Sequence, residues 1–120
     1  MEKEYHFSID LSVALDALCR VFDTRLRRSS GLLALEAAAN DVCRRLCCFG
    51  AKVHFSRRHS SHLMHLSLWL PLYPSDWWWI GTDFAAATVA IAAKRIDIAD
   101  EICSMIFSAV ASPQSVGEVN

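Results

Sequence analysis

The chain has 120 residues, of which 53% are hydrophobic and 21% are charged, so it holds enough apolar material for one core. Its formal net charge of -1 at neutral pH argues against a dedicated nucleic-acid binder, which would be strongly basic. We expect a single α+β domain over residues 1–111 and a flexible polar tail over residues 112–120.

The first predicted element is a strand over residues 3–9. Tyr5, Phe7 and Ile9 alternate with polar residues, which is the period of a half-buried strand. Asp10 is a suitable N-cap for a helix, and apolar residues recur at helical spacing from Leu11 onward. We therefore predict a first helix directly behind the strand, ending near the basic cluster Arg25, Arg27 and Arg28.

A second helix is predicted from residue 32 to residue 49. Apolar residues repeat at intervals of three and four, and Asp41 and Arg45 are spaced to form an i,i+4 ion pair on the outer side. Gly50 follows as a natural residue for the position after a helix end.

The next two apolar runs predict a β-hairpin with a turn over residues 58–61. A single register would place every apolar side chain on one face. It pairs Phe55 with Met64, Val53 with Leu66 and Ala51 with Leu68.

The last part of the chain is predicted to be helical. Pro71 ends the sheet, the tryptophan run 77–79 follows as a loop, and Thr82 or Asp83 caps a helix. Residues 84–110 form either one long helix or two helices joined near residues 95–97, with Asp97 capping the second. Because this segment is apolar on two sides, we expect it to be buried on two sides and part of it to meet a second copy in a homodimer.

These elements have the order β-α-α-β-β-α(α). They predict an α+β fold in which helices pack on one face of a small, antiparallel, three-stranded sheet. The other face of the sheet is then polar and open to solvent or to a ligand.

Three histidines are expected on that polar face. His54 and His65 are opposed in the predicted register, and His6 joins them if the first strand belongs to the same sheet. Converging imidazoles can hold zinc with one position open for water or substrate, but solvent-facing strands also tolerate histidine without any ligand. The sequence favours no cofactor, with zinc as the alternative. In the string His59, His62, His65 the last two face opposite sides of a strand.

The run Trp77, Trp78 and Trp79 is the most unusual local feature, since three adjacent large rings cannot all face one core. At least one ring should lie at a surface, where aromatic side chains dominate contact energies. Together with the basic hairpin turn Arg57, Arg58 and His59, this run is our predicted partner-binding site.

The sequence favours a cytoplasmic protein. Its five cysteines are an odd number without the spacing of a disulfide framework. The first ten residues mix charged and apolar side chains and do not resemble a signal peptide. The most apolar window, residues 77–93, is too short for a membrane span and contains Asp83.

Taken together, these features favour a small protein-binding or inhibitory accessory protein without catalysis. The chain has no glycine-rich phosphate loop and no nucleophile elbow. One alternative is a metal-dependent or pocket-based small-molecule enzyme that uses the sheet-face histidines. A second is a nucleic-acid-binding module, because residues 17–58 carry nine basic and three acidic side chains. The arginines that such a module would use are Arg25, Arg27, Arg28, Arg44, Arg45, Arg57 and Arg58.

Overall fold

The computed structural model describes residues 2–22, 32–59, 61–71 and 77–111. These residues form an α+β domain with the predicted element order, which confirms the predicted fold class. The elements in chain order are β1 (Glu2–Asp10), α1 (Leu11–Val21), α2 (Leu32–Arg45), the 3-10 turn η1 (Cys47–Phe49), β2 (Lys52–Arg58), β3 (Ser61–Pro71), α3 (Trp78–Ala92) and α4 (Ile96–Ala111).

The three strands form one antiparallel sheet in the order β1-β3-β2, so β3 is central and β1 and β2 are edge strands. The predicted hairpin register is confirmed at the pairs Val53 with Leu66 and Phe55 with Met64. The predicted pairing of Ala51 with Leu68 is not part of the ladder. Gly50 has a left-handed backbone (φ 61), so the chain is still turning there, and β2 begins only at Lys52.

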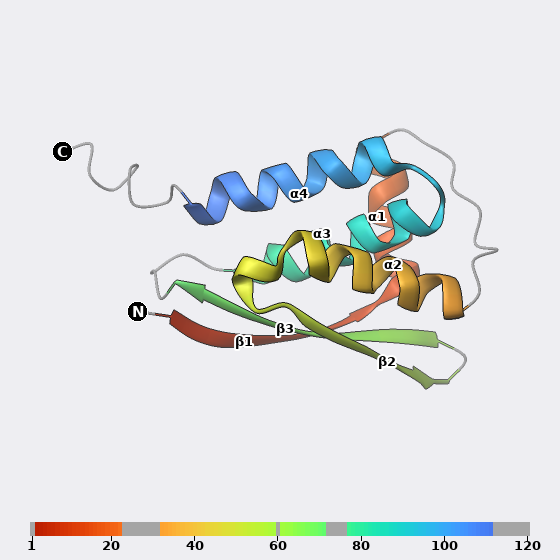
Figure 1. Ribbon diagram of the computed structural model, residues 1–120. Coiled ribbons are helices and arrows are strands. Elements are labelled where there is room, and N and C mark those ends of the chain that lie inside the picture. The colour runs from red at the N-terminus through yellow and green to blue at the C-terminus, as the bar shows by residue number, and fades with distance from the viewer. Residues whose placement is uncertain (1, 23–31, 60, 72–76, 112–120) are drawn as a thin grey trace.

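One face of the sheet is covered by helices and the other is open (Figure 1). Side chains alternate across β3, and the helix-facing residues are fully or almost fully buried. These residues are Met64, Leu66, Leu68 and Leu70. α1, α2 and α3 pack against the strands, while α4 packs on α3 as an outer layer.

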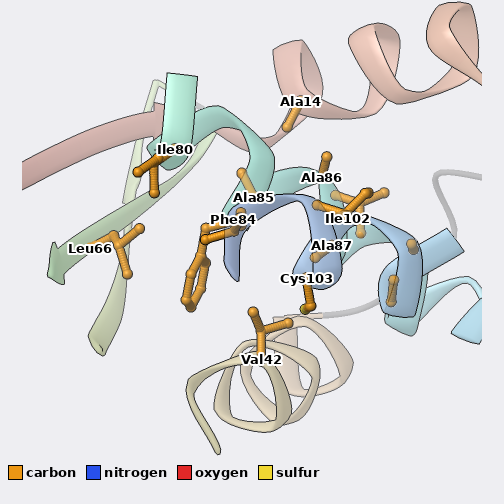
Figure 2. Packing of buried hydrophobic residues seen from close by; sticks show 14 of the residues in the cluster. Ala14, Val42, Leu66, Ile80, Phe84, Ala85, Ala86, Ala87, Ile102 and Cys103 are labelled. Carbon is orange, nitrogen blue, oxygen red and sulfur yellow. The ribbon is translucent and has the colours of Figure 1, made fainter. Parts of the chain in front are cut away.

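α3 lies at the centre of the molecule, so its middle part is buried on every side. Figure 2 shows Phe84 and Ala85 of α3 among side chains from α1, α2 and α4, including Ala14, Val42 and Ile102. All residues from Phe84 to Ala90 of this helix are buried. We predicted that a second copy would cover part of the two apolar sides of this segment. Along α3, both sides are buried within one chain.

The start of α3 differs from the prediction. The helix begins at Trp78 and not at Thr82 or Asp83, and Gly81 lies inside it instead of breaking the chain. Glycine is needed there because a Cβ atom would lie 2.6 Å from Cδ1 of Phe7 on β1. Gly81 is therefore the contact point at which α3 meets β1.

The other helix boundaries lie closer to the predicted ones. Asp10 caps α1, its carboxylate accepting the backbone N–H of Ser12 at 2.9 Å, as predicted. α2 ends at Arg45, earlier than predicted, and the 3-10 turn η1 fills the gap before Gly50. Residues 25–28, predicted at the end of the first helix, and the predicted tail at 112–120 lie outside the described residues.

The C-terminal segment forms two helices and not one. Lys94 has a left-handed backbone (φ 66) between α3 and α4. Asp97, the predicted cap, is instead the second residue of α4, where its carboxylate accepts hydrogen bonds from the Arg95 guanidinium at 3.1 Å. The break lets α4 fold back along α3.

Candidate functional site

Two surfaces of the described residues combine concave shape with chemically useful side chains. The first is the open face of the sheet, which holds a depression of about 400 Å³. The second is a groove of about 480 Å³ that runs along β1 beside the start of α3. The depression is lined by Glu4, His6, Phe7, Ser8, Lys52, Val53, His54, His65, Leu66 and Ser67.

His65 of the central strand connects all three strands on the open face. Its Nδ1 lies 3.0 Å from the Ser8 hydroxyl of β1, and its Nε2 lies 2.7 Å from the Ser56 hydroxyl of β2. A neutral imidazole donates from one ring nitrogen and accepts at the other, so two hydroxyls satisfy both. The ring of His54 stacks on that of His65 at a centroid distance of 4.7 Å.

Glu4 organises the other end of the depression. Its Oε2 accepts a hydrogen bond of 2.7 Å from the Ser67 hydroxyl, and its Oε1 lies 3.4 Å from Nε2 of His6. The depression therefore has an acidic end on β1 and a histidine pair between β3 and β2. It can offer hydrogen-bond donors and acceptors to a small polar molecule.

The three histidines predicted as metal ligands share the open face, as expected, but they are engaged in different interactions. His6 faces Glu4, while His65 bonds two serines and stacks on His54. Within the described ranges, no three His, Cys, Asp or Glu side chains are grouped so as to hold a metal ion. His62 lies on the opposite, helix-covered face from His65, as the strand alternation predicted.

The tryptophan run divides between core and surface, which confirms that at least one ring is exposed. Trp77 is buried, and its indole N–H donates to the Pro71 carbonyl at 3.1 Å. Trp79 is half-buried, with its ring 6.2 Å from that of Trp77. Trp78 is 66% exposed. The run thus anchors the start of α3 and exposes one large ring to solvent.

Trp78 borders the groove along β1. Five consecutive residues of β1 line this groove, from Tyr5 to Ile9, together with Trp77, Trp78 and Thr82 of the α3 start. In the part of the chain that the structure describes, β1 pairs with β3 and with no other strand, so this groove follows a sheet edge. Sequence reasoning missed it, since the strand order decides which strand is an edge.

The predicted basic part of the partner site lies elsewhere. Arg57, Arg58 and His59 are exposed at the hairpin turn that precedes β3, whereas the tryptophans follow the far end of β3. β3 has 11 residues, so its ends are separated by roughly 33 Å at the rise of an extended strand. The six residues predicted as one site therefore lie at opposite ends of β3 (Figure 1).

Part of the predicted basic surface is neutralised. Arg45 forms ion pairs with Asp41 of α2, at 3.4 Å, and with Asp100 of α4. Arg44 lies 3.6 Å from the same Asp41. An acidic residue of the C-terminal part thus folds against the basic segment. Of the other arginines proposed for nucleic acid, Arg25, Arg27 and Arg28 lie outside the described residues.

Three of the cysteines have thiol pKa values above the ordinary one. Burial raises the pKa of Cys43, Cys48 and Cys103, so these thiols are predominantly protonated at neutral pH. The thiolate is the nucleophilic form, and raised pKa values keep it scarce.

Comparisons with protein-family models, curated proteins and solved structures found no match for this chain. None of the helices in the described residues is long and apolar enough to cross a lipid bilayer.

Proposed function

We propose that this chain is a small cytoplasmic protein-binding accessory protein, inhibitory and non-catalytic in its action. Its contact surface is the edge groove, defined as the groove lined by residues 5–9 of β1 together with Trp77, Trp78 and Thr82. The partner is another protein or a second copy of the chain, and no cofactor takes part.

The single observation that supports this proposal most strongly is the position of Trp78. Trp78 is 66% exposed, so its indole ring presents a large apolar area to water. It sits beside a concave surface and on a helix that its neighbour Trp77 anchors in the core. Rigidly held aromatic side chains next to a groove are the residues that most often dominate protein interfaces.

A capture experiment tests this proposal. Tagged wild-type protein, Trp78→Asp and Val21→Asp are used as baits in a lysate of the source organism, and bound proteins are quantified by mass spectrometry. Val21 on α1 is 75% exposed, so its variant controls for the loss of an exposed apolar side chain elsewhere. We expect a protein that is retained by wild type and Val21→Asp and lost with Trp78→Asp.

The captured protein is then purified, and its affinity is measured by calorimetry. A tryptophan at an interface centre contributes enough that Trp78→Asp should weaken binding at least about tenfold. Equal affinities for wild type and Trp78→Asp would contradict the proposed surface.

The open face supports a second candidate function, a pocket-based enzyme acting on a small molecule. The hydrogen bond of 2.7 Å between the Ser56 hydroxyl and Nε2 of His65 is the geometry in which imidazole activates a serine. A fluorophosphonate probe tests this candidate, because it labels activated serines. Labelling that is lost in both Ser56→Ala and His65→Gln, and kept in Ser67→Ala, would favour the enzyme. No labelling would remove this candidate.

A further inference from the structure

The two edge strands differ in how they would meet a copy of themselves. An edge strand carries a row of backbone N–H and C=O groups directed away from the sheet, and these groups can pair with another extended strand. Both β1 and β2 are edges in the order β1-β3-β2. Side-chain charge decides which of the two tolerates pairing with a second copy.

The β2 edge repels its own copy. Of its seven residues, three are basic and none is acidic. Two β2 strands side by side would bring six cations together, and like charges on neighbouring strands destabilise pairing. The basic residues are Lys52, Arg57 and Arg58.

The β1 edge is self-complementary in one antiparallel register. With a two-fold axis at Tyr5, Glu4 of each copy lies opposite the partner's His6, and Glu2 lies opposite the partner's Ser8. On the helix-facing side, Lys3 lies opposite the partner's Phe7. This register opposes no like charges, whereas an axis at His6 would place Glu2 opposite the partner's Asp10.

The edge groove fits the same arrangement. It runs along residues 5–9, and residues 5–8 of this stretch belong to the ladder, in which they lie opposite residues 5–2 of the second copy. In this register the partner's Tyr5 lies opposite Tyr5, which lines the groove together with the exposed Trp78. Closed two-fold contacts of this kind are the commonest form of soluble oligomer.

We infer that two copies of the chain associate through antiparallel pairing of their β1 strands about a two-fold axis at Tyr5. The product is a continuous six-stranded sheet in the order β2-β3-β1-β1-β3-β2. The inference rests on the proposed function, because it names a second copy as an occupant of the edge groove.

Light scattering coupled to size exclusion measures the assembly over a wide concentration range. We expect wild type and Val21→Asp to have the mass of two chains of 13.4 kDa each. Trp78→Asp should have the mass of one chain, with an unchanged far-ultraviolet circular dichroism spectrum. A monomeric wild type at all concentrations would overturn the inference.

Charge exchange tests the register. Glu4→Lys puts a cation opposite the partner's His6 at two symmetric places, and we expect the dimer to dissociate about tenfold more readily. Glu4→Lys combined with His6→Glu restores opposite charges and should recover most of the affinity. A double variant as weak as the single one would overturn the register.

Photo-crosslinking locates the contact. A benzoylphenylalanine at position 5 should crosslink to β1 of the second copy, and the same group at position 54 on β2 should not. A dimer that crosslinks through β2 or α4 would overturn the inference. A monomer that still captures a Trp78-dependent partner from lysate would overturn only the dimer, and the proposed function would stand.

Discussion

The two faces of the sheet use the same strands for different purposes. On the helix-covered face, β3 contributes leucines and a methionine that are at most 2% exposed. On the open face, the same strand contributes His65, Ser67 and Trp69, and the first two are held by hydrogen bonds to β1 and β2. Stability therefore comes mainly from one face, which leaves the other face free to vary in chemistry.

The largest expected effect comes from removing apolar volume on the covered face. Leu66→Ala should lower the free energy of unfolding by about 2–5 kcal/mol, because Leu66 is 2% exposed and its loss leaves a cavity. Its neighbour on the open face is the control. Ser67→Ala removes one hydrogen bond to Glu4 and should cost only about 0.5–1.5 kcal/mol. Chemical denaturation measures both, and equal losses would contradict the division of roles.

The contact between α3 and β1 gives the next largest effect. Gly81→Ala should destabilise the fold by about 1–3 kcal/mol, because the new Cβ would overlap the Phe7 ring. Alanine is otherwise the better helix residue by about 1 kcal/mol, so the sign of the change identifies the steric contact. Phe7→Leu should reduce the penalty in the double variant. A stabilised single variant would show that α3 and β1 lie further apart.

His65 on the open face should contribute less to the stability of the fold than the contact between α3 and β1. His65→Leu removes the hydrogen bonds to Ser8 and Ser56, each worth about 1 kcal/mol on average. Combining it with Ser8→Ala and Ser56→Ala in double-variant cycles measures the coupling. We expect each serine variant to be nearly silent once His65 is absent. Independent, additive losses would mean that the hydroxyls do not bond the ring in solution.

The smallest effect depends on pH and concerns Asp83 on the covered side. Burial raises the pKa of this half-buried carboxyl above that of a free aspartate. The folded state then binds more protons than the unfolded state, so stability falls as pH rises through the raised pKa. Asp83→Asn should melt at a higher temperature than wild type at neutral pH and at the same temperature in acid. An advantage that persists in acid would point to a cause other than charge burial.

The sequence by itself determined the local features of this protein. Alternation in β2 and β3 has only one register that keeps the apolar residues together, so the pair Phe55 with Met64 could be predicted. Asp10 could be recognised as a cap because capping depends on residues adjacent in the chain. The open face could be predicted from the alternation of the strands, which placed His6, His54 and His65 together.

Only the tertiary structure decided what lies between distant segments. The placement of β1 beside β3 brings Ser8 to His65 and makes β1 an edge strand, and the sequence gives no local signal for either. The need for glycine at position 81 could not be predicted, because the Phe7 ring that requires it lies 74 positions away in the chain. Likewise, α3 is covered within one chain because α4 folds back over it at Lys94. Sequence patterns report on residues that are close together in the chain, whereas these features depend on residues that are close only in space.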